Sequence, residues 1–172
     1  MIKLLNWLIK QNRTTIKTKS PTPETSEWLS WKPSIYPPNA PEGFIRLNGA
    51  SDISVAGTSF RLQDCRVALS ALKDYRVTGS AIDLVRDASD PTHPNAIRVV
   101  FKLKHRDVDI GYLPADISDM IAHSFSEVMP LKAGLREWGQ KKTGDAVFFR
   151  VSVFVPSAKD RKKYEAGRLN KI

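Results

Sequence analysis

Hydrophobic and polar residues alternate over much of the second half of the chain, as they do in strands with one buried face. The alternation is strict in residues 97–103, and in residues 146–155 the apolar residues at every second position from Val147 to Val155 predict a core face. Shorter runs of the same character cover residues 44–47, 53–55, 82–86, 108–112 and 131–138. Asn48-Gly49, between the first two of these, is a typical turn dipeptide. The pattern predicts a fold built mainly from short strands.

Two segments have a helical period instead. Leu62, Cys65, Leu69 and Leu72 recur three or four residues apart, which predicts an amphipathic helix. A second helix is predicted after Pro114, with Asp116 as its N-cap. Its predicted buried stripe is Ile117, Met120, Ile121, Phe125 and Val128. Short strands interrupted by two helices favour a mainly β, α+β fold: a small, OB-like modified β-barrel.

The ends of the chain differ from its middle, and we divide the chain into four segments. They are an amphipathic N-terminal helix (1–11), a Pro/Ser/Thr-rich linker (12–42), the barrel domain (43–156) and a basic C-terminal tail (157–172). The linker has neither a helical nor a strand period, and its prolines argue against a continuous element. Trp28, Trp31 and Tyr36 are unusual in a free linker, so we expect them to contact the domain or a partner.

The formal charge of +9 at pH 7 is concentrated in the first 42 and last 16 residues. A basic chain favours polyanionic partners, although solvated lysine-rich ends would have the same composition. On the tail, lysines and arginines can neutralise phosphates without reading bases.

Cys65 is the single cysteine, which excludes an intramolecular disulfide and a multi-cysteine zinc site. Residues 1–11 are too short to span a bilayer. We predict a cytoplasmic protein.

Catalytic chemistry has little support in the sequence. No serine lies in a nucleophile-elbow pattern, and Cys65 falls on the apolar face of its predicted helix. Asp87, Asp90 and His93 share one loop and could chelate a metal, but the same residue types are ordinary turn formers. We therefore expect no catalytic residue, no metal and no cofactor. A metal-dependent enzyme is the weakest hypothesis.

A nucleic-acid surface has more support, because aromatic and cationic side chains cluster at predicted strand ends. Phe60 and Arg61 follow one strand, and Arg86 ends another. Arg98 and Lys102 lie on the polar side of the next strand. The alternative for these two cations is a solvated strand face, and the alternative for Phe60 is packing in the core.

Three stretches, in this order and spacing, resemble the HIRAN domain family. They are VAGTSF at 55–60, LVRDASDPTHPNAI at 84–97 and IGYLP at 110–114. The resemblance extends over about residues 53–156. It implies an OB-like barrel that recognises single-stranded DNA and, in helicase-fused members, captures a free 3′ end. It also implies that Phe60 stacks a terminal base, that Asp90 bonds the terminal hydroxyl and that Arg61 contacts phosphate.

The loop departs from the family pattern at two positions. Thr92 and His93 stand where the family commonly has an aromatic residue and a second acid. His93 can still donate or accept a hydrogen bond, so we keep it in the candidate site, together with Tyr112 of the third stretch. We predict a non-catalytic module that binds single-stranded DNA or DNA ends, with RNA as a further candidate, in DNA repair, replication or mobile-element biology. The alternative is an adaptor that docks a protein through residues 1–36, or a membrane through residues 1–11.

Overall fold

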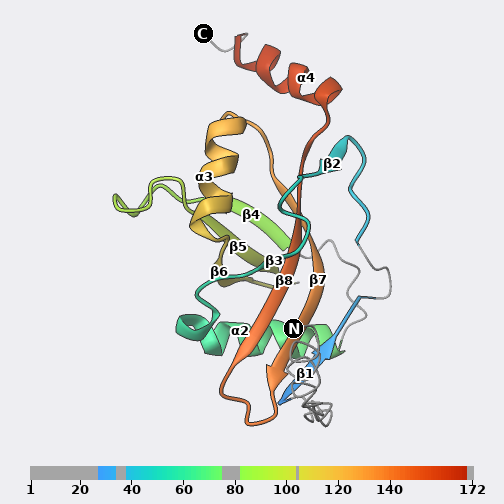
Figure 1. Cartoon of the computed structure of the whole chain (residues 1–172), viewed down its shortest axis with the longest axis vertical. Helices are drawn as coiled ribbons and strands as arrows, with labels where there is room; N and C mark the ends of the chain where they lie inside the picture. Colours follow the sequence, from blue (N-terminus) through green and yellow to red (C-terminus); the bar gives the residue numbers. More distant parts are fainter. Residues whose placement is uncertain (1–26, 34–37, 75–81, 104, 170–172) are drawn as a thin grey trace, which may run out of the picture.

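The computed structural model describes residues 27–33, 38–74, 82–103 and 105–169. Eight strands form one antiparallel sheet in the order β2-β8-β7-β4-β5-β6, with β1 paired to β7 and β3 to β8 (Figure 1). The strands are β1 (Trp28–Trp31), β2 (Phe44–Arg46), β3 (Ile53–Ser54), β4 (Ile82–Arg86), β5 (Ile97–Lys102), β6 (Asp107–Tyr112), β7 (Lys132–Lys141) and β8 (Val147–Pro156). The helices are α2 (Leu62–Asp74), α3 (Ala115–Ser124) and α4 (Ala158–Leu169), with a 3-10 turn η1 (Thr58–Arg61).

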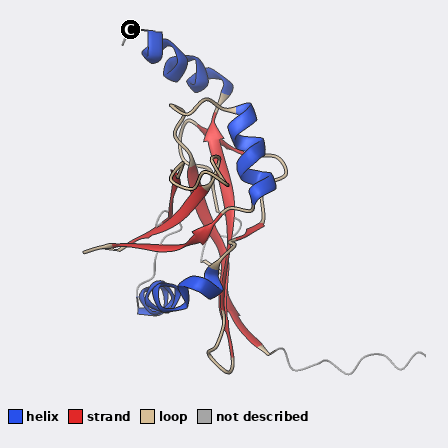
Figure 2. Ribbon diagram, turned by 90° about the vertical axis from the view of Figure 1, so that its left-hand side faces the viewer, coloured by secondary structure: helices blue, strands red, loops and turns tan. Residues whose placement is uncertain are grey.

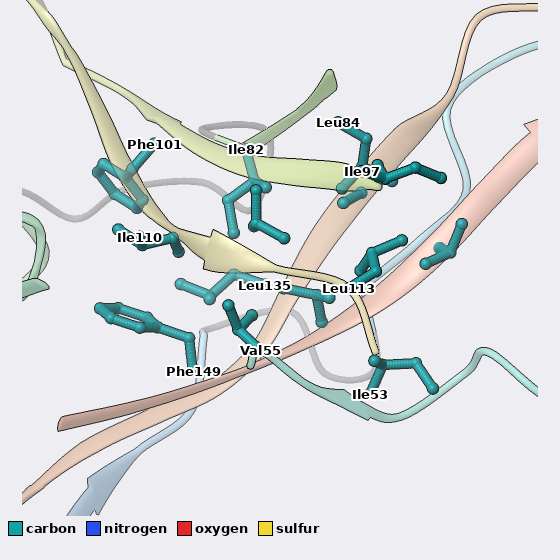
Figure 3. Close-up of a cluster of buried hydrophobic side chains, with 14 of the residues drawn as sticks. Ile53, Val55, Ile82, Leu84, Ile97, Phe101, Ile110, Leu113, Leu135 and Phe149 are labelled. Atoms are coloured by element: carbon teal, nitrogen blue, oxygen red, sulfur yellow. The ribbon is translucent and has the colours of Figure 1, made fainter. Parts of the chain in front are cut away.

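The long β7–β8 hairpin runs through the middle of the molecule, and the other strands are arranged around it (Figures 1 and 2). The core face predicted for β8 is confirmed, because Val147, Phe149, Val151, Val153 and Val155 are all buried; beyond Val151 the residues between them are buried as well. Side chains from β3 to β8 then fill one core (Figure 3). Because one antiparallel sheet supplies most of this core, the mainly β, OB-like α+β fold predicted from the sequence is confirmed.

A single bridge joins the two ends of the curved sheet. The Ala56 N–H donates to the Tyr112 carbonyl at 2.8 Å, and the Tyr112 N–H donates to the Ala56 carbonyl at 2.9 Å. Gly111 makes this approach possible, because a Cβ there would overlap the Ala56 carbonyl oxygen and lie 2.8 Å from Val55 Cγ1. Its φ of 141° is also one that residues with side chains rarely adopt. The sheet is therefore curled like a barrel without being closed by a continuous ladder.

Both helices predicted within the barrel domain are present, but α3 differs from the prediction at its two ends. Pro114 occupies the N-cap position, and Asp116 lies inside the first turn, so Asp116 is not the N-cap. The helix ends at Ser124, because Phe125 is extended with φ −140° and ψ 127°. Val128 therefore lies beyond the helix and is 47% exposed, not part of a buried stripe. A third helix, α4, forms in the segment predicted as a tail.

Part of the predicted linker is a strand. β1 pairs with β7 from Trp28 opposite Lys141 to Trp31 opposite Trp138, which corrects the expectation of no strand in residues 12–42. The expectation that the two tryptophans contact the domain is confirmed, because Trp31 packs against the core and the Trp28 ring meets Phe148 edge-on at 5.3 Å.

Interstrand pairing with β7 holds β1 in place, so Trp28–Trp31 form a strand without a hydrophobic period of their own. Gly139 allows β1 to approach β7 closely, since a Cβ there would overlap the Leu29 carbonyl oxygen.

Tyr36 and the predicted helix at residues 1–11 lie outside the described residues, and the four-segment division of the chain stays a prediction. None of the helices in the described ranges is long and apolar enough to span a membrane.

Candidate nucleic-acid interface

One groove of about 670 Å³ lies where the Ala56–Tyr112 bridge, η1, the β4–β5 loop and the first turn of α3 meet. The β4–β5 loop, residues 87–96, projects from the sheet beside α3 (Figure 1). Residues from all three stretches that resemble HIRAN domains therefore line this groove. The bridge sets their distance, because it fixes the chain just before η1 against the end of β6.

Phe60 is the most exposed large apolar side chain in the described ranges, at 91% of its surface. It lies on η1, which begins after Gly57 at a left-handed φ of 78°. The alternative in which Phe60 packs in the core is therefore wrong. Water-exposed aromatic rings of this size are unfavourable unless a partner covers them. The ring is free to stack against a planar ligand group.

Arg61 is held rigidly beside the ring of Tyr112. Its Nε lies 3.3 Å from Asp109 Oδ1, and its Nη2 donates to the Tyr112 hydroxyl at 3.3 Å. The guanidinium carbon is 4.8 Å from the Tyr112 ring centre, within cation–π range. The Tyr112 hydroxyl in turn donates to Asp87 Oδ2 at 3.3 Å. These contacts orient the cation before any ligand arrives.

The β4–β5 loop is preorganised by two Asx turns, in each of which an aspartate carboxylate accepts a hydrogen bond from the backbone N–H two residues further on. Asp87 Oδ1 accepts from the Ser89 hydroxyl at 2.6 Å and from the Ser89 N–H at 3.1 Å, which lowers the pKa of Asp87. Asp90 Oδ1 likewise accepts from the Thr92 hydroxyl at 2.6 Å and from the Thr92 N–H at 2.8 Å. These bonds, with one to His93, lower the pKa of Asp90 to about 2. At neutral pH both groups are carboxylates that can only accept hydrogen bonds.

His93 closes the second turn. Its Nδ1 lies 3.2 Å from Asp90 Oδ2 and 2.9 Å from Thr92 Oγ1. Asp87 instead faces Tyr112 and Arg98, so the two acids of the loop have different partners. Over the described ranges, no group of three His, Cys, Asp or Glu side chains is placed to hold a metal ion.

Five of the eight residues predicted from the sequence line the groove: Phe60, Arg61, Asp90, His93 and Tyr112. The other three, Arg86, Arg98 and Lys102, do not line it. The Arg98 Nε lies 3.2 Å from Asp87 Oδ2, so Arg98 forms an ion pair with the β4–β5 loop without lining the groove. Whether any of the eight contacts nucleic acid stays a prediction.

The two remaining cations are engaged elsewhere. Arg86 Nη2 donates to the Ser126 carbonyl at 3.3 Å, and partial burial lowers the pKa of its guanidinium. Lys102 Nζ lies 2.6 Å from Asp107 Oδ2 and 3.7 Å from Asp83 Oδ2. The hydrogen bond to Asp107 raises the pKa of Lys102. These contacts could not be predicted from the sequence, because each joins groups on separate strands or loops.

Sequence reasoning missed the wall that α3 contributes. Ser118 is 2% exposed, lines the groove, and its hydroxyl has no hydrogen-bond partner in the described part of the chain. Next to it, Asp119 Oδ1 accepts from Asn95 Nδ2 at 2.9 Å, which ties α3 to the loop. The sequence offered one weak signal for Ser118: a polar residue adjoining the predicted apolar stripe of the helix.

The groove is richer in acids than in bases. Asp87, Asp90 and Asp119 line it, against Arg61 as the one lysine or arginine among its lining residues. Carboxylates attract hydrogen-bond donors and repel phosphates. The interior therefore suits hydroxyl and amino groups, and phosphates are better placed at its edge near Arg61.

The family model described as the HIRAN domain matches residues 48–152, more than half of the chain. This range contains the whole groove and leaves out β1 and α4. No curated protein and no solved structure matches the chain.

Proposed function

Since the chain belongs to the HIRAN domain family, whose domain is a DNA-binding module, we propose that the groove binds the end of a single DNA strand without catalysing a reaction. The observation that carries this proposal is the exposed Phe60 ring at the rim of a preorganised groove. Stacking of a base on an aromatic ring is worth about 1–3 kcal/mol and needs a base that is not already stacked in a duplex. A strand end supplies such a base.

The polar walls favour an end that has a free hydroxyl. Asp90 and Asp119 accept hydrogen bonds, and a terminal sugar hydroxyl donates one. A terminal phosphate in the same place would face both carboxylates. We therefore propose a 3′-hydroxyl end as the preferred ligand, with Arg61 contacting the preceding phosphate. The Asx turns at Asp87 and Asp90 reduce the entropy that the loop loses on binding.

Fluorescence anisotropy with a set of labelled oligonucleotides tests this proposal. We expect a single strand with a free 3′ hydroxyl to bind more tightly than a blunt duplex, a 3′-phosphorylated strand or an RNA of the same sequence. The label is placed at the 5′ end, so that it does not occupy the groove. Equal affinity for all four probes would contradict end recognition, and no binding at physiological salt would contradict the function itself.

Ser118→Ala is expected to change stability and binding in opposite directions. A buried hydroxyl without a partner costs about 1–3 kcal/mol, so its removal should raise the free energy of unfolding by about 1 kcal/mol. If the ligand supplies the missing partner, the affinity for the 3′-hydroxyl strand should fall about fivefold, the worth of one hydrogen bond. Urea unfolding and anisotropy measure the two effects.

Ser124→Ala is the matched control, because Ser124 ends the same helix and does not line the groove. It should leave the affinity unchanged. If Ser118→Ala lowered stability and left binding intact, the Ser118 hydroxyl would have a structural role.

We keep the adaptor hypothesis as the second candidate only for the part of the chain outside the described residues. Within the described range, Trp28 and Trp31 contact the domain itself, so they are not available as a free docking segment. A role in DNA repair, replication or mobile-element biology is part of the proposal and follows from strand-end binding.

A further inference from the structure

The C-terminal segment is an ordered basic helix that projects from the domain. α4 follows β8 after one residue, and its sequence, AKDRKKYEAGRL, has five basic and two acidic side chains. Residues 162–167 are all exposed, and none of the described side chains of α4 belongs to the core. Figures 1 and 2 both place it beyond the end of α3 that is far from α2. α4 lies outside the range that matches the HIRAN family.

Its first turn is fixed to the domain by several contacts. The Ser157 N–H donates to the Gly43 carbonyl at 2.8 Å, and the Ser157 hydroxyl donates to Asp160 Oδ2 at 2.7 Å. The Arg161 guanidinium lies over the Phe125 ring, 4.4 Å from its centre, and its Nε donates to the Pro156 carbonyl at 3.0 Å. Phe125 directly follows α3, so Arg161 joins α4 to the far end of the helix whose first turn lines the groove.

Two lysines of α4 are available for a ligand. Lys159 and Lys162 are exposed and have no ion-pair partner in the described ranges, whereas Lys163 pairs with Asp160 at 2.7 Å. Residues 162 and 163 are three and four positions after residue 159, so the three share one face of the helix. Without an apolar face, α4 lacks what a helix needs to lie in a membrane surface. A polyphosphate backbone fits this face better.

The distance from the groove to α4 follows from the elements between them. Ten residues of α3 at 1.5 Å each span about 15 Å. Along β8, the five steps from Val151, which lies opposite Ile53, to Pro156 span about 17 Å at 3.3 Å each. Both estimates place the start of α4 about 15–17 Å from the groove. At roughly 3.4 Å per nucleotide in a stacked strand, a trinucleotide in the groove ends short of α4, and a 20-nucleotide strand passes it.

We propose that α4 is a second, rigidly placed nucleic-acid contact, which binds the phosphates of a strand whose end occupies the groove. This inference rests on the proposed function. It differs from a mobile basic tail in one respect: a fixed helix contributes only when the bound strand is long enough to reach it. A mobile tail would fold back onto a short ligand as well.

The experiment compares two variants on two probes, a 3′-hydroxyl trinucleotide and a 20-nucleotide single strand. Lys159→Gln with Lys162→Gln should weaken binding of the 20-mer about tenfold at low salt. It should also reduce the slope of log K against log salt by about 1.4, for two lost phosphate contacts. Binding of the trinucleotide should not change. Lys142→Gln is the matched control: Lys142 is exposed in the β7–β8 turn, at the opposite end of β8.

Arg161→Lys tests whether α4 must be fixed to the domain in order to bind the 20-mer. It keeps the charge but loses the planar contact with Phe125, so 20-mer binding should weaken about threefold with circular dichroism unchanged. An unaffected 20-mer, or an equal loss on both probes, would overturn the inference while leaving groove binding intact. Lysine-dependent binding to phosphatidylserine vesicles in place of the 20-mer would also overturn it. If the wild-type protein bound neither probe, the proposed function itself would fail.

Discussion

Gly111→Ala is expected to lower the free energy of unfolding by about 3 kcal/mol. An added Cβ would overlap the Ala56 carbonyl oxygen and lie 2.8 Å from Val55 Cγ1, and both belong to the segment that joins the two ends of the sheet. Overpacking of this kind costs about 1–3 kcal/mol, and a strained φ adds a similar amount. Urea unfolding followed by far-ultraviolet circular dichroism measures the loss.

The control for this variant is Gly49→Ala. Gly49 also has a left-handed φ, of 78°, but a Cβ there would meet no atom within 4 Å. It should therefore cost about 1 kcal/mol, for the backbone conformation alone. Equal effects of the two variants would show that the close approach at Ala56 contributes nothing. If Gly111→Ala did not fold at all, the intact Gly49→Ala would still place the cause at the bridge.

Phe60→Ala is expected to weaken binding of a 3′-hydroxyl single strand by about 10- to 100-fold, the loss of one stacked base. Its stability should stay within about 0.5 kcal/mol of the wild type, because the side chain is 91% exposed and buries almost nothing. The two numbers together separate a stacking ring from a core residue, whose truncation costs about 3–5 kcal/mol. Anisotropy and thermal melting supply both.

Two further variants sharpen this test. Phe60→Trp should keep most of the affinity, since an indole ring also stacks, whereas Phe60→Leu should lose it although it keeps an apolar side chain. Val128→Ala, at an exposed apolar position outside the groove, should have no effect on binding. A Phe60→Leu variant that bound like the wild type would exclude stacking as the role of Phe60.

The candidate site shows where sequence reasoning succeeded and where it stopped. The loop of Asp90 and His93, the segment with Phe60 and the glycine that precedes Tyr112 were identified from the residues and their resemblance to HIRAN domains, and the fold brings them to one groove. Local patterns cannot tell which charged side chains remain free. Each of Arg86, Arg98 and Lys102 contacts a group that is distant in sequence or lies across a turn, and that contact takes it out of the groove lining.

α4 shows a different limit. Because α4 packs almost no side chain into the core, it has no hydrophobic period by which a helix is usually predicted. A local signal was nevertheless present: Ser157 and Asp160 have the S-x-x-D spacing of a helix start, and the structure shows the Ser157 hydroxyl bonded to Asp160. Local capping, more than burial, defines where this helix begins.

Side-chain period and turn chemistry act over a few residues, so local patterns specify the strands with alternating residues, the helix at Leu62–Asp74 and the composition of the groove loop. Trp28–Trp31, by contrast, is a strand only because its hydrogen bonds come from β7. Tertiary contacts also curl the sheet until Ala56 meets Tyr112, and they place Ser118 in the lining of the groove. These features depend on partners that are distant along the chain, and no local pattern specifies a partner.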